Sequence, residues 1–87
     1  MLGKILIVED EANIRELIKF NLIKEGYNII EAEDGLTALE LVRKEKPDLI
    51  VLDLMLPGMD GMELCRSLKN KRESSSVAII MLTAKSE

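Results

Sequence analysis

The sequence predicts an α/β fold in which helices cover a parallel β-sheet. Short segments rich in β-branched residues alternate with longer segments of helical periodicity, and three of the short segments are nearly continuous apolar runs. Such runs are typical of strands that are buried on both faces. Hydrophobic residues make up 47% of the chain but aromatic residues only 2%, so the core must consist of aliphatic side chains. This composition suits helices packed on a parallel sheet.

Four strands are expected, at residues 4–10, 27–32, 48–53 and 77–83. Between the first two lies a helix whose residues recur at helical spacing, namely Ile14, Leu17, Ile18, Asn21 and Leu22. Gly26 follows at a position suited to a left-handed C-cap. The first helix should therefore end just before Gly26.

A second helix is expected over residues 35–45, because Pro47 disfavours helical geometry at Lys46. A third helix should begin at Asp60, whose spacing to Glu63 allows a capping box, and should end in the polar stretch 70–76. Strands and helices thus alternate along the chain, which predicts right-handed crossovers between parallel strands. Strand orders 2-1-3-4 and 3-2-1-4 are both compatible with this succession of elements.

Composition limits the function. Eighty-seven residues fit one domain, and sixteen acids against twelve bases give a net charge of -4, which argues against a nucleic-acid-binding surface. The single cysteine, Cys65, cannot form an internal disulfide. The chain has no signal peptide and no apolar run long enough to cross a membrane, so we expect no membrane association and a cytoplasmic location.

Acidic residues follow two of the expected strands. Glu9, Asp10 and Glu11 stand at the end of the first strand, and Asp53 ends the third. In the 2-1-3-4 order these carboxylates converge at a switch point of the sheet, where they would suit a hard cation such as Mg²⁺. Acids after strands are also ordinary loop residues or helix caps, and we interpret two others in that way, Asp34 and Asp60.

Two further features lie near the same sheet edge. Thr83 and Ala84 end the fourth strand, where a hydroxyl could donate to an anion at Asp53 and a small side chain would leave room for it. The loop 54–61 contains Pro57 and two glycines, which indicates an irregular path after Asp53.

Three motifs together resemble a known family: ILIVEDE, PDLIVLDLMLPGMDG and IIMLTAK. They are similar to the receiver domain of two-component response regulators, most closely to the OmpR/PhoB group of winged-helix transcription factors. The resemblance implies a flavodoxin-like (CheY-like) fold of order 2-1-3-4-5, phosphorylation by a sensor histidine kinase, and Mg²⁺ as cofactor. It also implies residue roles: Asp53 as phosphoacceptor, Glu9 and Asp10 as metal-binding acids, Met55 as a carbonyl ligand of the metal, and Thr83 as the switch hydroxyl.

One part of the family pattern is not found. The family carries a lysine after a fifth strand, whereas this sequence ends at Glu87, and Lys85 is too close to Thr83 to be that lysine. We therefore expect residues 1–87 to form a single, C-terminally truncated receiver domain without the fourth helix, fifth strand and fifth helix. Such a chain should self-associate through the fourth strand or the uncovered sheet face. DNA binding would belong to an output domain outside this segment.

A phosphatase with an aspartate nucleophile is an alternative from another class of protein. Such enzymes usually need a second acid two residues after the first, and Met55 stands at that position. We therefore expect a signalling domain rather than an enzyme.

Overall fold

The computed structural model describes residues 3–53, 55–56, 59–70 and 77–82. Its main sheet has four parallel strands, β1 (Lys4–Val8), β2 (Asn28–Ala32), β3 (Leu49–Asp53) and β6 (Ala78–Leu82). The helices are α1 (Ala12–Lys24), α2 (Gly35–Glu45) and α3 (Gly61–Asn70). A short antiparallel pair, β4 (Met55–Leu56) with β5 (Met59–Asp60), lies between β3 and α3 along the chain.

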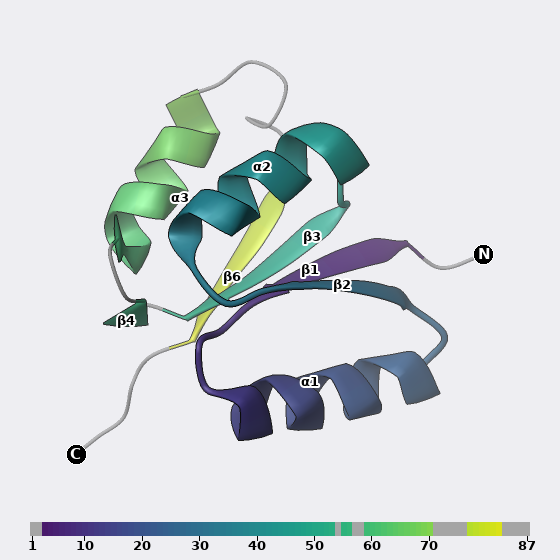
Figure 1. Ribbon diagram of the computed structural model, residues 1–87. Coiled ribbons are helices and arrows are strands. Elements are labelled where there is room, and N and C mark those ends of the chain that lie inside the picture. The colour runs from purple at the N-terminus through teal and green to yellow at the C-terminus, as the bar shows by residue number, and fades with distance from the viewer. Residues whose placement is uncertain (1–2, 54, 57–58, 71–76, 83–87) are drawn as a thin grey trace.

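The strand order is β2-β1-β3-β6, which confirms the flavodoxin-like prediction and excludes the 3-2-1-4 alternative. Strand β1 pairs in parallel with both β2 and β3, so the crossovers on its two sides run in opposite directions. Right-handed crossovers then place the intervening helices on opposite faces. Figure 1 shows α2 and α3 on one face of the sheet and α1 on the other.

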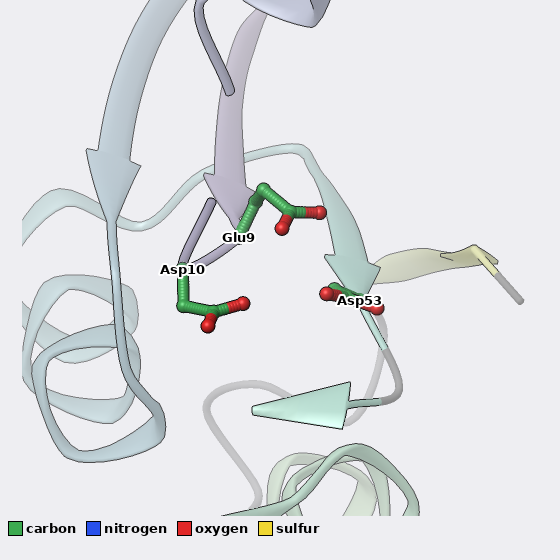
Figure 2. Close-up of side chains that lie close together, drawn as sticks. All are labelled: Glu9, Asp10 and Asp53. Carbon is green, nitrogen blue, oxygen red and sulfur yellow. The ribbon is translucent and has the colours of Figure 1, made fainter. Parts of the chain in front are cut away.

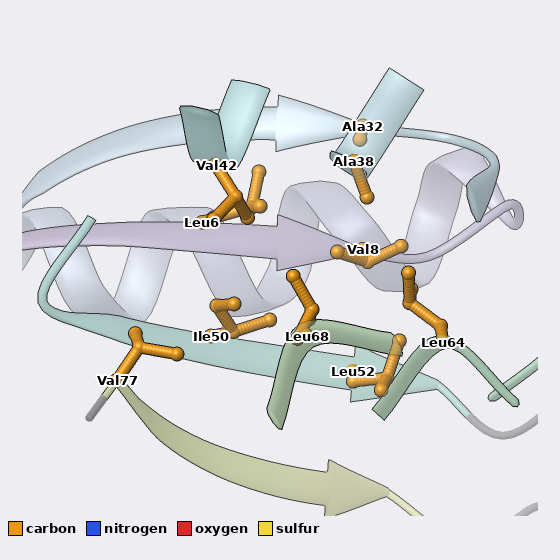
Figure 3. Close-up of a cluster of buried hydrophobic side chains, with 10 residues drawn as sticks. All are labelled: Leu6, Val8, Ala32, Ala38, Val42, Ile50, Leu52, Leu64, Leu68 and Val77. Atoms are coloured by element: carbon orange, nitrogen blue, oxygen red, sulfur yellow. The ribbon is translucent and has the colours of Figure 1, made fainter. Parts of the chain in front are cut away.

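Alternate residues of the central strands build two apolar layers. Between the sheet and α2/α3, Leu6 and Val8 of β1 join residues of β3 and both helices (Figure 3), the full set being Leu6, Val8, Ala32, Ala38, Val42, Ile50, Leu52, Leu64, Leu68 and Val77. On the α1 face, Ile5, Ile7 and Val51 are buried. Because successive strand residues point to opposite faces, continuous apolar runs supply both layers.

The expected ends of the first two helices are confirmed. Gly26 has a φ of 97°, and its N–H donates to the carbonyl of Ile23 at 2.9 Å after α1. Lys46 adopts the left-handed conformation with φ 50° and ψ 63°, so α2 ends at Glu45, two residues before Pro47. The start of α2 is capped by Asp34, whose Oδ1 accepts from the backbone N–H of Thr37 at 2.8 Å. Local chemistry therefore fixes these boundaries.

The described part of the segment after β3 is more regular than expected, whereas Pro57 and Gly58 lie outside the described residues. The predicted irregular loop contains the β4–β5 pair, and α3 begins at Gly61, directly after Asp60 ends β5. The first strand was also predicted too long, because β1 ends at Val8 and not at Asp10. The last residues paired with β1 are Ala32 and Leu52, so Glu9 and Asp10 stand beyond the regular pairing of β1.

The apolar stripe predicted for the first helix packs only in part. Ile18 and Leu22 pack on the buried α1-face layer, whereas Ile14 and Leu17 are 45% and 62% exposed. None of the residues of α1, all of which are described, is buried. Periodicity identified the helix correctly, but it did not show that one flank stays exposed.

Ion pairs to β2 fix the rotation of α1. The Nε of Arg15 and the Nζ of Lys19 bind the two carboxylate oxygens of Glu31, at 3.1 and 2.8 Å. Ile14 and Leu17 lie on the opposite flank of the helix at helical spacing, and this flank therefore faces the β3 and β6 side. None of the helices within the described residues has the length and hydropathy needed to cross a membrane.

The ion pairs of Glu31 predict a pH-dependent contribution to stability. The hydrogen bond and charge of Lys19, and then those of Arg15, lower the pKa of the Glu31 carboxyl below its ordinary 4.5. A lowered carboxyl pKa stabilises the fold above the unfolded value, and this gain is lost as the pH falls through the folded value. Glu31→Gln should therefore reduce the free energy of unfolding by about 1 kcal/mol at neutral pH, and by progressively less below about pH 4.5.

Urea unfolding of Glu31→Gln across a pH series tests this expectation. Glu33→Gln is the matched control, since Glu33 is an exposed acid two residues further on. A loss of stability in Glu31→Gln that is the same at neutral and at acidic pH would contradict the assignment.

Candidate functional site

Three carboxylates meet at the edge of the sheet where β1 and β3 end. Glu9 and Asp10 follow β1, and Asp53 is the last residue of β3. One oxygen from each side chain can be chosen so that all three lie within 4.8 Å of one another. Figure 2 shows the carboxylates of Glu9, Asp10 and Asp53 around a common space. The structure thus brings together the three acids that the sequence analysis singled out.

The topology explains this convergence. Strands β1 and β3 are parallel neighbours, so their carboxyl ends reach the same edge. The chain leaves β1 toward α1 on one face and enters α3 from β3 on the other, so the connections diverge from this edge (Figure 1). A switch point of this kind is where open α/β sheets bind ligands.

Hydrogen bonds hold Glu9 in one position. Its backbone N–H donates to the carbonyl of Ala32 at 3.0 Å, and its carbonyl accepts from Nη1 of Arg15 at 2.7 Å. Its side-chain Oε2 accepts from the N–H of Glu11 at 3.0 Å. The residue is only 3% exposed, so this carboxylate is largely removed from water.

Burial and like charge act on Glu9 in the same direction. Burial raises the pKa of the Glu9 carboxyl above 4.5, and Asp53 raises it further through its charge and a hydrogen bond between the two side chains. Asp10 adds repulsion, whereas the hydrogen bond from the Glu11 N–H opposes these effects. Carboxylates that raise one another's pKa are relieved by a cation among them. Their oxygen atoms suit a hard ion such as Mg²⁺.

The other residues that were expected at the site lie in different places. Met55 starts β4 two residues after Asp53, which places its backbone close to the acids along the chain. Thr83 and Ala84 lie outside the described residues. Glu11 is exposed, and its backbone N–H supports Glu9. Asp34 caps α2 as expected, and Asp60 directly precedes α3.

Arg15 was missed by the sequence analysis. It binds the carbonyl of Glu9 and the carboxylate of Glu31, which connects α1, β2 and the acidic strand end. Its position one helical turn after Glu11 was visible in the sequence. The pairing with Glu31, sixteen residues away, depends on how β2 lies beside β1.

Comparison with known proteins agrees with this fold and site. The family model of the response regulator receiver domain matches residues 5–87. The chain therefore belongs to the response regulator receiver domain family, whose members act as phosphoacceptor signalling domains in two-component systems.

Solved structures of such domains are similar over nearly the whole chain. The N-terminal domain of a response regulator receiver protein from Methanoculleus marisnigri JR1 is 34% identical, with a TM-score of 0.94 over 100% of this chain and 71% of that one. The BeF3-activated receiver domain of Klebsiella pneumoniae RstA is 39% identical, with a TM-score of 0.86 over 97% and 69%. The Mn²⁺-bound response regulator Rcp1 is 28% identical, with a TM-score of 0.87 over 99% and 68%.

Proposed function

We propose that Asp53 accepts a phosphoryl group from a sensor histidine kinase in a step that depends on Mg²⁺. The observation that carries this proposal is the convergence of Glu9, Asp10 and Asp53 within 4.8 Å at the carboxyl edge of β1 and β3. Asp53 alone among these acids ends a strand of the sheet, while the other two come from the neighbouring strand end. These positions support Asp53 as the acceptor and Glu9 and Asp10 as the acids that bind the metal beside it.

The transfer is an in-line displacement at phosphorus. A carboxylate oxygen of Asp53 forms a bond to the phosphorus as the bond from phosphorus to the kinase histidine nitrogen breaks, and the electron pair of that bond stays on the imidazole. The product is an acyl phosphate on Asp53. Positioning and charge neutralisation supply most of the catalysis in reactions of this type. When bound, Mg²⁺ neutralises charge that develops on the phosphoryl oxygens.

Four groups of this chain would hold the metal: the carboxylates of Glu9, Asp10 and Asp53 and the backbone carbonyl of Met55. Oxygen donors of this kind fit Mg²⁺, which takes one or two carboxylates together with phosphate and water. The raised pKa of Glu9 supports the fit, because burial disfavours its charged form, Asp53 and Asp10 add repulsion, and a cation would offset both effects. The Mn²⁺-bound relative Rcp1 also supports a divalent ion in this fold.

The remaining roles follow from the family motifs. Thr83 is proposed as the switch hydroxyl that binds the phosphoryl group, with the small Ala84 leaving access to the site.

We propose no enzymatic turnover, since Met55 stands where an aspartate-nucleophile phosphatase would need a second acid. The parent protein is proposed to be a cytoplasmic transcription regulator of the OmpR/PhoB group, and the 39% identity with the RstA receiver supports a relation at this level. DNA would be bound by an output domain and not by this acidic segment.

Asp53→Asn should abolish phosphorylation, because the amide lacks the nucleophilic carboxylate. Intact-mass analysis after incubation with Mg²⁺ and acetyl phosphate should show one added phosphoryl group on the parent and none on the variant. Uptake by the parent should be slow, since the family lysine that helps to neutralise the phosphoryl oxygens is not among these residues. Glu11→Gln is the control, because Glu11 is a neighbouring acid outside the cluster. Uptake by Asp53→Asn at the parent's rate would refute the acceptor.

Mg²⁺ should raise the melting temperature, because it binds the folded state and relieves the repulsion among the three acids. A concentration about ten times the dissociation constant adds roughly 1.4 kcal/mol, or about 5 to 10 °C for a domain of this size. Asp10→Ala should remove most of this increase. Glu40→Ala removes the same charge from an exposed position on α2 and should keep it. A parent melting temperature that is constant across millimolar Mg²⁺ would count against the metal site.

We further propose that the 87-residue chain self-associates through the α1 face of β6. Val51 of β3 pairs in register with Ile80, so Ile80 points to the same face as the buried Val51. Ile80 is nevertheless 51% exposed, and Ile14 and Leu17, which helical spacing places on the flank of α1 nearer to β6, are 45% and 62% exposed. Strand β6 is also an edge of the described sheet, and its residues Ala78–Leu82 contain no charge and no proline. Such an edge favours pairing with a second copy, most simply as a symmetric dimer.

Ile80→Lys should therefore shift the chain toward a monomer. The change places a charge on the proposed contact, and light scattering coupled to size exclusion at micromolar concentration measures the mass. Leu36→Lys is the matched control, because Leu36 is 74% exposed on α2, on the other face of the sheet. A parent that runs as a monodisperse monomer with a cooperative thermal transition would exclude the proposed association.

A further inference from the structure

The side chain of Arg15 connects three elements beside the acidic site. Its Nη1 donates to the backbone carbonyl of Glu9 at 2.7 Å, and its Nε donates to Oε1 of Glu31 at 3.1 Å. Only 18% of the side chain is exposed. One guanidinium on the first turns of α1 is therefore bound both to β2 and to the chain that leaves β1.

The bond to Glu9 falls on a particular peptide group. The carbonyl of Glu9 belongs to the peptide bond that joins Glu9 to Asp10, the two acids after β1. Regular pairing of β1 ends at Val8, opposite Ala32 and Leu52. Beyond it, the N–H of Glu9 is held by the carbonyl of Ala32 at 3.0 Å, and its carbonyl is held by Arg15. These two bonds hold the planar peptide groups on both sides of the Glu9 Cα, so they fix the direction of the Glu9 side chain and the position of the Asp10 Cα.

We propose that Arg15 is a positioning residue for the metal site: by holding the Glu9–Asp10 peptide group, it sets the two carboxylates at the geometry that binds Mg²⁺. The inference rests on the proposed Mg²⁺ site and adds to it a residue that touches neither the metal nor the phosphoryl group. Groups that orient metal ligands from behind commonly change metal affinity by about 10- to 100-fold when they are removed.

The geometry of the guanidinium, and not its charge alone, carries this role. Glu31 neutralises the charge of Arg15 locally, and Lys19 binds the second oxygen of Glu31 at 2.8 Å and so holds that carboxylate in place. A guanidinium presents several N–H donors in a fixed plane, so it can bind the Glu31 carboxylate and the Glu9 carbonyl together. A lysine at this position would keep the charge but has a single donor atom. Arg15→Lys therefore separates positioning from simple charge.

The structure offers a closely matched control at the other end of β1. The Nζ of Lys4 donates to a carboxylate oxygen of Glu45 at 2.9 Å and to the backbone carbonyl of the same residue at 3.2 Å. Like Arg15, Lys4 thus binds one carboxylate and one backbone carbonyl, and it links β1 to α2. Lys4 opens β1 at the end of the strand remote from the acids. Lys4→Met should lower stability without any effect on the metal site.

The test measures Mg²⁺ affinity by isothermal titration calorimetry on the parent, Arg15→Met, Arg15→Lys and Lys4→Met. We expect affinity to fall about tenfold in both Arg15 variants, and to stay within about twofold of the parent in Lys4→Met. The metal-free ¹⁵N spectrum provides a second readout, because the amide of Asp10 belongs to the peptide group that Arg15 holds. Its resonance should move in the Arg15 variants and stay in place in Lys4→Met.

The Mg²⁺ affinities of the Arg15 variants decide whether Arg15 positions the two acids. Parent-like Mg²⁺ affinity in Arg15→Met, or its full recovery in Arg15→Lys, would overturn the positioning role, and the second result would leave a role for charge alone. If Arg15→Met does not fold, Arg15→Lys and Glu31→Gln carry the test, and unchanged affinity in both overturns the inference. If the parent itself binds no Mg²⁺, both the proposed metal-dependent function and the role of Arg15 fail. If the parent binds Mg²⁺ and the Arg15 variants bind it equally well, only the role of Arg15 fails.

Discussion

The position of β1 between β2 and β3 is the constraint on which the rest of the structure depends. Parallel pairing on both sides forces the two crossovers to run in opposite directions, which places α1 on one face and α2 and α3 on the other. The same pairing brings the carboxyl ends of β1 and β3 to one edge. The two apolar layers and the acidic cluster therefore have a common origin, and a different neighbour for β1 would remove all of them together.

The acidic cluster opposes the stability that the apolar layers supply. Leu6, Ile7 and Val8 are fully buried just before the chain reaches Glu9, so rigid packing ends where the carboxylates begin. The protein keeps Glu9 buried beside Asp10 and Asp53, although burial and their charges raise its pKa. This unfavourable arrangement persists because strand pairing and hydrogen bonds from Glu11 and Arg15 hold the backbone and side chain of Glu9. Perturbed carboxylates of this kind are typical of functional sites.

The sequence predicted the features that depend on local chemistry. The ends of α1 and α2 followed from Gly26 and Pro47, and the α/β class followed from the apolar runs. The strand order did not follow from periodicity, because β1 meets β3 through contacts between residues about 44 apart in the chain, such as Ile5 with Leu49. Motif resemblance supplied that order, and with it the convergence of the three acids. Arg15 was missed for the same reason, since its acceptor on β2 becomes a neighbour only in the folded sheet.

The two faces of the sheet are held by different forces, and this difference bears on the site. The α2/α3 face is closed by residues such as Leu64 and Leu68, which are 0% and 1% exposed. Helix α1 contributes no buried residue, so its position depends more strongly on the pairs that Arg15 and Lys19 form with Glu31. The same guanidinium holds the Glu9–Asp10 peptide group. The geometry of the two acids that are proposed to bind the metal is therefore coupled to the polar attachment of α1, whereas the core beneath α2 and α3 can set the overall stability separately.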